Sequence, residues 1–234
     1  MVPIEEQIWK GNATNGYKLI SGTLKVYDMI SSSAASNNKL YRPIEYLNLE
    51  KGSLENNGQI LEDFNNSTGF RSVNWRNGTA NYYNYETDVN LDYYSNGNLK
   101  KVTKRNSLKT YYVWGYNQTQ IISKIENYTS INSSQQSAID DAVSESNNDD
   151  DRCLNSETCN EKTLRNKLTL LRNAFPDAHV TTFTHDPLIG VTSITDPRGN
   201  ITYYEFNDLN YLDKVKDTDE KILLSNEYYY YKGQ

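Results

Sequence analysis

The sequence contains no run of about 18 apolar residues, and residues 1–6 have neither the basic nor the apolar region of a signal peptide. A direct membrane span and an N-terminal export signal are therefore not expected in it. Clusters of Lys and Arg are also missing, and 24 basic against 30 acidic residues give a net charge of −6 and a pI near 5.1. Since nucleic acids and anionic membranes are bound through clustered cations, neither is an expected partner.

Core-forming residues are scarce as well. Hydrophobic residues make up 36% of the chain with its 20 tyrosines included. With glycine counted instead of tyrosine they make up about a third, against about 45–50% in ordinary domains. An aromatic fraction of 12% nevertheless argues against a disordered chain. Because tyrosine combines an apolar ring with a hydrated hydroxyl, the composition favours a thin-walled shell or solenoid over a compact two-layered core.

A short motif recurs along the chain. Residues 191–203 align with residues 212–224 at a shift of 21 residues, and residues 99–111 align with them as a third copy. The paired positions include Ile194 with Val215, Asp196 with Asp217, and Ile201 with Ile222. A fixed short period predicts a stacked array of similar units. Because so few copies would leave open ends, Met1 is expected to begin a piece of a longer protein.

Residues 1–128 are predicted to form a β-rich, repeat-like region. Short segments of alternating apolar and polar residues are separated there by turn residues, the pattern that is typical of hairpins. Asn77-Gly78 and Asn96-Gly97 are dipeptides that favour the positive φ of such turns. Strands are expected to resume near residue 179, so that residues 178–234 form the C-terminal repeats.

Residues 129–177 interrupt this pattern and predict a helical hairpin with an acidic, cysteine-containing loop. Residues 133–143 predict a weak helix with few apolar residues to dock it. Residues 161–175 predict an amphipathic helix that stops at Pro176. Its apolar face consists of Leu164, Leu168, Leu171 and Phe175. The predicted class is mainly β, with this α-helical hairpin inserted between repeat copies and protruding from the strands.

The second copy resembles a known bacterial repeat. Residues 206–217 read Phe-Asn-Asp-Leu-Asn-Tyr-Leu-Asp-Lys-Val-Lys-Asp. This resembles the RHS repeat, also called the YD repeat, whose core runs roughly Tyr-Asp-x-x-Gly-Arg-Leu-x-x-Val-x-Asp-x-x-Gly. The similarity extends through residues 184–206 and, upstream, through residues 94–99 and 113–117. The resemblance implies a C-terminal stretch of a large cell-surface or secreted RHS-repeat protein of bacteria, in which β-hairpins form a strip of a β-shell or β-solenoid.

The chain also departs from the family pattern. His185 and Phe206 stand where the repeat has Tyr, Asn207 stands where it has Asp, and Glu220 stands where it has Gly. Such departures are typical of a worn, terminal repeat. Family members that are toxins carry a variable effector after an aspartyl self-cleavage core, and neither is recognised here. The expected function is therefore a non-catalytic structural or interaction segment, with a component of a toxin-delivery shell as the alternative.

Ten positions are predicted to form the core of the repeats. These repeat-core residues are Val102, Tyr111, Trp114, Ile194, Gly199, Tyr203, Phe206, Leu212, Val215 and Ile222. No residue is predicted to be catalytic, and no metal or cofactor is expected. The expected partners are the remainder of the protein's own repeat array or a component of the secretion machinery, with a cell-surface glycan as a further candidate.

Cys153 and Cys159 are candidates for a local disulfide, because five intervening residues allow their Cα atoms to come within bridging range. Two free surface thiols are the alternative. A zinc site that adds His179 and His185 has the right number of ligands. Its spacing is nevertheless wider than usual, so the disulfide is favoured.

The acidic residues suggest two other chemistries. Residues 149–151, together with Asp140 and Asp141, could hold Ca²⁺, but their spacing matches no known loop and favours a solvated acidic loop. Four aspartates recur with the repeat and invite a glycan hydrolase hypothesis. They are Asp186, Asp196, Asp208 and Asp217. Recurrence in register instead favours turns, in which Asp bonds its own backbone.

The remaining candidates are aromatic and basic side chains. Tyr82, Tyr83 and Tyr204 could contact a glycan or a partner as a carbohydrate-binding module does, although tyrosine packing across strands is the favoured interpretation. His179 and His185 lack a Ser or Cys nucleophile in a recognisable motif, which argues against a catalytic triad.

Overall fold

The computed structural model describes most of the chain as antiparallel strands with two helices, which confirms the predicted mainly-β class. The described residues are 2–12, 16–30, 40–49, 55–56, 59–60, 73–74, 79–80, 85–151 and 159–229. The chain divides into two compact units, Met1–Ser107 and Leu108–Gln234. The predicted change at residue 129 marks the passage from strands to helices, which lies inside the second of these units.

The first unit is an antiparallel meander with the strand order β1-β2-β3-β8-β9. Its strands are β1 (Val2–Asn12), β2 (Gly16–Ile30), β3 (Leu40–Leu49), β8 (Tyr85–Tyr93) and β9 (Leu99–Lys104). Two small pairs join β4 (Glu55–Asn56) to β5 (Gln59–Ile60) and β6 (Val73–Asn74) to β7 (Thr79–Ala80). Only Leu24, Val26 and Leu47 form a buried cluster in the described part of this unit, so it has little core of its own.

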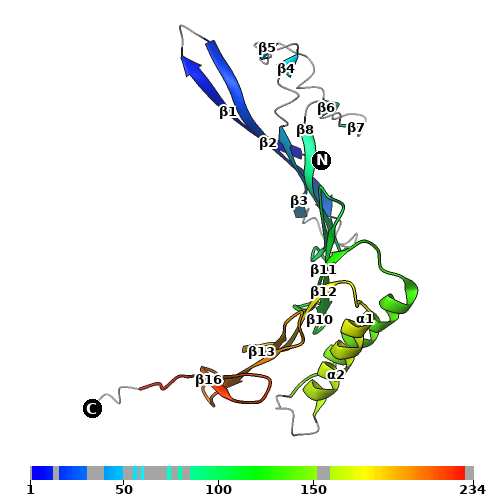
Figure 1. The fold of residues 1–234 in the computed structure, drawn as a ribbon, viewed down its shortest axis with the longest axis vertical. Helices are drawn as coiled ribbons and strands as arrows, with labels where there is room; N and C mark the ends of the chain where they lie inside the picture. The colour runs from blue at the N-terminus through cyan, green and yellow to red at the C-terminus, as the bar shows by residue number, and fades with distance from the viewer. Residues whose placement is uncertain are drawn as a thin grey trace. The chain divides into compact units, whose positions relative to one another are not determined.

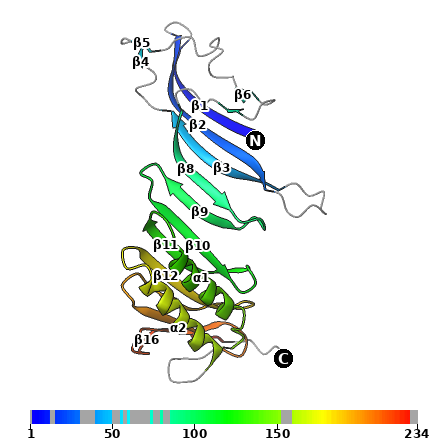
Figure 2. The same cartoon turned by 90° about the vertical axis from the view of Figure 1, so that its right-hand side faces the viewer.

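The second unit is also an antiparallel meander, with the order β10-β11-β12-β13-β14-β15-β16. Its strands are β10 (Lys109–Gly115), β11 (Gln120–Tyr128), β12 (His179–Asp186), β13 (Gly190–Thr195), β14 (Ile201–Phe206), β15 (Leu212–Lys216) and β16 (Ile222–Ser225). The helices α1 (Ser133–Ser146) and α2 (Asn160–Asn173) lie between β11 and β12 in the chain. Figures 1 and 2 show both helices against one face of the strands β10 to β12.

The two helices supply the main hydrophobic core of the second unit. Its buried cluster contains Val113, Tyr116, Ile122, Ile125, Ile139, Ala142, Leu164, Leu168, Leu171, Phe175 and Val180. The predicted apolar face of residues 161–175 is confirmed, because all four of its residues are buried. The expectation that the hairpin protrudes was wrong. Amphipathic helices are stable when their apolar stripe is buried, and the apolar face of the strands β10 to β12 provides the surface on which both helices pack.

Local interactions fix the two ends of α1, and one of them sets how closely α1 approaches the sheet. Asn132 and Gln135 form a capping box at the start of α1, since each side chain accepts a hydrogen bond from the other's backbone N–H. At the other end of α1, Ser146 packs on Gly115 of β10. A Cβ atom at Gly115 would lie 2.2 Å from Ser146 Oγ, so only glycine permits this approach.

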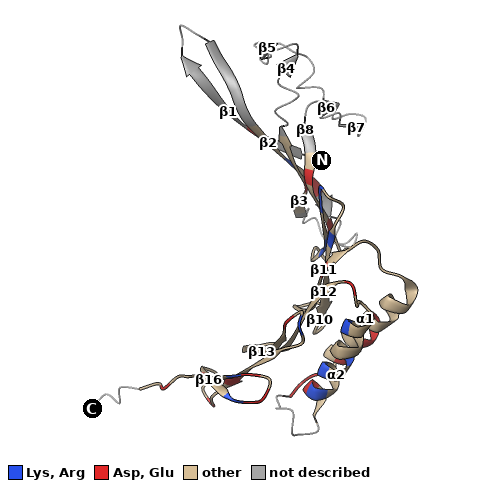
Figure 3. Cartoon of the chain, viewed as in Figure 1, with Lys and Arg blue, Asp and Glu red and all other residues tan. Residues whose placement is uncertain are grey.

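Charges of both signs are mixed over the elements of the molecule. Figure 3 shows Lys and Arg next to Asp and Glu along α2 and on several strands, whereas the charged residues of α1 are all acidic. No helix of the described residues is long and apolar enough to cross a membrane.

Candidate functional site

The recurring aspartates lie in the turns of the C-terminal hairpins. Asp196 Oδ1 accepts hydrogen bonds from the backbone N–H groups of Arg198 at 2.8 Å and Asn200 at 2.9 Å. Its Oδ2 accepts a third from the Asn200 side chain, and this bond is the main reason that the pKa of Asp196 lies below its usual value. The turn closes with the Gly199 N–H bonded to the Asp196 carbonyl, with Gly199 at φ 94°.

Two further turns repeat this arrangement. Asn207 Oδ1 accepts from the N–H groups of Leu209 and Tyr211, and Asp217 Oδ1 accepts from those of Asp219 and Lys221. The left-handed position is taken by Asn210 at φ 61° and by Glu220 at φ 62°. Each 21-residue period therefore contains two such turns and two strands. The carboxylates of Asp196 and Asp217 hold their own backbone, as the turn hypothesis predicts.

The upstream copy shows the same backbone pattern. Gly97 N–H bonds the Tyr94 carbonyl with Gly97 at φ 88°, and Ser107 N–H bonds the Lys104 carbonyl with Ser107 at φ 64°. The structure thus gives the three copies the same turns, including positions where Ser, Asn or Glu replaces the glycine of the motif.

The left-handed turn position predicts opposite effects of two exchanges. Gly199→Ala is expected to lower the free energy of unfolding by about 1 kcal/mol, because a side chain disfavours positive φ. Glu220→Gly is expected to raise it by up to about 1 kcal/mol, since it relieves the same cost in the equivalent turn. Urea unfolding of both variants measures this. Since a Cβ at Gly199 would meet nothing within 4 Å, a much larger loss in Gly199→Ala would contradict the backbone explanation.

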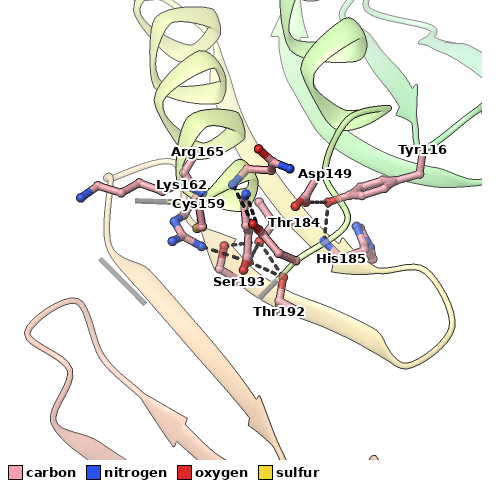
Figure 4. A network of polar contacts seen from close by, with 12 residues as sticks. Tyr116, Asp149, Cys159, Lys162, Arg165, Thr184, His185, Thr192 and Ser193 are labelled. Carbon is pink, nitrogen blue, oxygen red and sulfur yellow. Dashed lines mark hydrogen bonds and ion pairs between the residues drawn. The ribbon is translucent and has the colours of Figure 1, made fainter. Parts of the chain in front are cut away.

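A buried polar network joins the start of α2 to the strands β12 and β13. Glu161 in the first turn of α2 is 2% exposed and pairs with Arg165 at 3.0 Å. Glu161 Oε1 also accepts hydrogen bonds from the Oγ1 atoms of Thr184 at 2.7 Å and Thr192 at 2.5 Å. Ser193 is 2.6 Å from Thr184 Oγ1, and Figure 4 shows these hydroxyls converging below the helix. The Glu161 charge is thus neutralised and hydrogen-bonded, which suits a structural role.

A second buried group adjoins this network. Tyr116 follows β10 and donates its hydroxyl hydrogen to Asp149 Oδ2 at 2.6 Å, while the Tyr116 hydroxyl oxygen accepts from the backbone N–H of His185 at 2.8 Å. Figure 4 shows the Tyr116 hydroxyl pointing at Asp149, with His185 beside the Tyr116 ring. Burial is the main cause of three shifts. It raises the pKa of Asp149 to about 7, with the Glu161 charge adding to the effect and the Tyr116 hydrogen bond opposing it. It raises the pKa of Tyr116 and lowers that of His185 to about 4.

The acidic residues are solvated only in part, since Asp140, Asp141 and Asp150 are exposed as the sequence predicts. Asp149 is 6% exposed. Asp151 accepts hydrogen bonds from the backbone N–H groups of Asn160 and Glu161, both at 3.0 Å, and Asp150 accepts from the Asn160 side chain. Carboxylates placed at a helix start satisfy its free N–H groups and its dipole. The expectation was wrong for Asp149, which is buried against Tyr116, while Asp151 serves to cap α2.

The metal hypotheses gain no support from the geometry. Within the described ranges, no group of three or more His, Cys, Asp or Glu side chains could hold a metal ion. Cys159 is disulfide-bonded, and its sulfur accepts a hydrogen bond from the Lys162 N–H at the start of α2. Cys153 lies outside the described residues, so its pairing with Cys159 stays a prediction. His179 lies 3.3 Å from the Asn127 side chain, and His185 packs against Tyr116.

The repeat-core residues occupy the strands and turns of the meander. Tyr203 is 1% exposed and lies under the Arg165 guanidinium, 5.6 Å from ring centroid to cation. Gly199 lies in an exposed turn, and Ile222 on β16 is exposed. The other members are half-buried, namely Val102, Tyr111, Trp114, Ile194, Phe206, Leu212 and Val215. Partial burial of this kind is expected where a single sheet has little covering it.

The other sequence candidates do not gather into one site. Tyr204 is half-buried on β14, while Tyr82 and Tyr83 lie outside the described residues. Asp186 bonds the backbone of its own turn through the Leu188 N–H, and Asp208 is exposed in the next turn but one. Sequence reasoning missed the Glu161 network. The sequence signal that could have revealed this network is the set of hydroxyl residues on β12 and β13, at positions 182, 184, 192 and 193.

No family model matches the sequence, and comparison with curated proteins finds no relative.

Proposed function

We propose that this chain is a non-catalytic structural and interaction segment of a bacterial cell-surface or secreted protein of the RHS or YD-repeat type. In this proposal its hairpins form part of a β-shell, and its partner is the remainder of the repeat array or a component of the secretion machinery. The observation that carries the proposal is the periodic turn. The side chains of Asp196, Asn207 and Asp217 each accept hydrogen bonds within the turn of a hairpin, so these recurring residues stabilise the sheet.

The edge strand β16 supports an interactive role. It pairs with β15 on one side and ends the strand order of the described sheet, and its residues Ile222, Leu223 and Leu224 are all exposed. An exposed apolar edge strand is a template for pairing with another strand. In a repeat array, a neighbouring hairpin with the same turns would cover such an edge.

Sedimentation velocity tests this proposal. The chain is expected to associate reversibly with rising concentration, and Leu223→Lys is expected to return it to monomer because a charge blocks edge pairing. Leu188→Lys is the matched control, since Leu188 is 96% exposed in the turn before β13, away from the edge. It should leave association unchanged.

Two results would contradict the proposal. One is a monomer at every concentration together with no binding to added β-hairpin repeat segments. The other is hydrolysis of a glycan by the purified chain that Asp196→Asn abolishes, which would favour the glycan hydrolase alternative.

A further inference from the structure

A cavity of about 450 Å³ lies in the second unit, on the sheet face opposite the helices. Tyr112 and Trp114 line it from β10, and Phe183 lines it from β12. Val113, between the two β10 aromatics, belongs to the core under the helices. Because neighbouring side chains of a strand point to opposite faces, Tyr112 and Trp114 point away from that core. The cavity size is within the range of small-molecule sites.

Two β-bulges shape this cavity. On β11 the register steps from Ile121, opposite Trp114, to Ser123, opposite Val113, which leaves Ile122 as the extra residue. On β13 a second step leaves Thr192 between the partners of His185 and Thr184. Bulges bend a strand and redirect its side chains, and they are frequent beside binding sites. Here His185 and Val191 come to line the cavity while Thr192 turns to Glu161.

A strained loop forms one edge of the cavity. Tyr116, Asn117 and Gln118 are consecutive non-glycine residues at φ 48°, 54° and 68°. Left-handed residues normally occur singly, so a run of three stores strain of the kind that collects at functional sites. The end of α1 holds the loop, since Ser146 Oγ accepts from the Tyr116 N–H and Asn147 Oδ1 accepts from the Asn117 N–H. The next two residues, Thr119 and Gln120, line the cavity.

His185 supplies a polar ring to the lining of this cavity. It is 8% exposed, and its Nδ1 atom has no hydrogen-bond partner within the described chain. Because burial lowers the pKa of His185 to about 4, the ring is neutral at physiological pH and carries one donor and one acceptor. Because Nδ1 itself is sealed from solvent, the ring can reach a ligand only through Nε2.

The charges around the cavity point to an uncharged ligand. The only charged side chain among its lining residues is Lys124, whose ammonium group pairs with Glu126 at 2.8 Å. What remains is an aromatic surface bordered by the Gln120 amide, the Thr119 hydroxyl and the neutral imidazole. Aromatic rings stack on apolar C–H surfaces, and the polar groups can bond hydroxyls at the ring edge.

We infer that this cavity binds an uncharged pyranose ring of a glycan, with Trp114 as the stacking platform and His185 as a hydrogen-bonding partner. The site uses none of the recurring aspartates. It also does not depend on the proposed role in a repeat array, because every lining residue belongs to the second unit. A purely apolar peptide side chain would make no use of the Gln120 amide and the imidazole ring that line the cavity, which is why the sugar is favoured.

Titration of the full chain with uncharged sugars tests the inference. The probes are glucose, galactose, mannose, N-acetylglucosamine and their disaccharides, followed by saturation-transfer NMR and calorimetry. At least one is expected to bind. Trp114→Leu, which keeps apolar bulk without a ring, is expected to weaken that affinity by about tenfold. His185→Phe is expected to weaken it by about fivefold or more. Tyr229→Phe, at a side chain 89% exposed, is the control and should bind as wild type.

Circular dichroism and the melting temperature establish that each variant is folded, and Phe183→Leu replaces Trp114→Leu if the latter is not. Binding of none of the probes would overturn the inference. So would sugar binding that persists in both folded aromatic variants. If sugars fail while a tryptophan-containing peptide binds wild type and not Trp114→Leu, the cavity is a peptide site instead.

Discussion

Arg165→Met is expected to lower the free energy of unfolding by about 3–5 kcal/mol, the cost of leaving one partner of a buried ion pair uncompensated. Glu161 and Arg165 are 2% and 7% exposed, so water cannot replace the lost guanidinium. The exchange also removes the cation that lies over the Tyr203 ring. Urea unfolding followed by circular dichroism measures the loss.

A second exchange separates the charge from the packing. Glu161→Gln removes the charge but keeps an oxygen that can accept from Thr184 and Thr192. The double variant Glu161→Gln, Arg165→Met is therefore expected to recover more than half of the stability lost in Arg165→Met. Equal losses in the single and double variants would show that the pair contributes through packing alone.

Apolar and polar contacts together hold the helices on the sheet. The sequence shows the apolar face of α2, and Leu164, Leu168 and Leu171 are buried as that face predicts. In α1 the buried residues include Gln135 and Ser146, which no hydrophobic pattern marks as core. Gln135 is satisfied by Tyr128 and by the Ala174 carbonyl, groups that folding brings to it. Sequence periodicity cannot anticipate a core that is completed by polar contacts between distant segments.

The hairpin turns could be predicted from the sequence, whereas the Glu161 network could not. Asp196 and Asp217 bond their own turns, which depends only on residues within four positions, so local chemistry suffices to predict it. Glu220 in the left-handed region is the exception, since nothing in its side chain favours positive φ. The cavity was not predictable, because the bulges at Ile122 and Thr192 are visible only in the strand register.

Asp149 and His185 are expected to make opposite contributions to stability between about pH 4 and 6.5. The pKa of Asp149 is raised from 3.8 to about 7, so the folded state holds a proton that the unfolded chain releases, and stability is lost as the pH rises through this range. The pKa of His185 is lowered from 6.5 to about 4, so the unfolded chain takes up the proton, and stability is lost as the pH falls. At about 1.4 kcal/mol per pKa unit, the effect over the full range is at most roughly 4 kcal/mol for Asp149 and roughly 3 kcal/mol for His185.

Single exchanges should separate the two effects. Asp149→Asn keeps an acceptor for the Tyr116 hydroxyl and removes the acid, so its stability is expected to rise from pH 4 to 6.5 through His185 alone. His185→Phe keeps an aromatic ring against Tyr116, and its stability is expected to fall from pH 4 to 7 through Asp149 alone. The double variant Asp149→Asn, His185→Phe measures the pH dependence of stability that the remaining titratable groups cause. Chemical unfolding at half-unit pH steps measures all four proteins, and parallel profiles would show that neither group titrates with folding. Because the two slopes oppose each other, the wild-type contribution of the pair should be nearly flat up to about pH 6.5 and decline only close to pH 7.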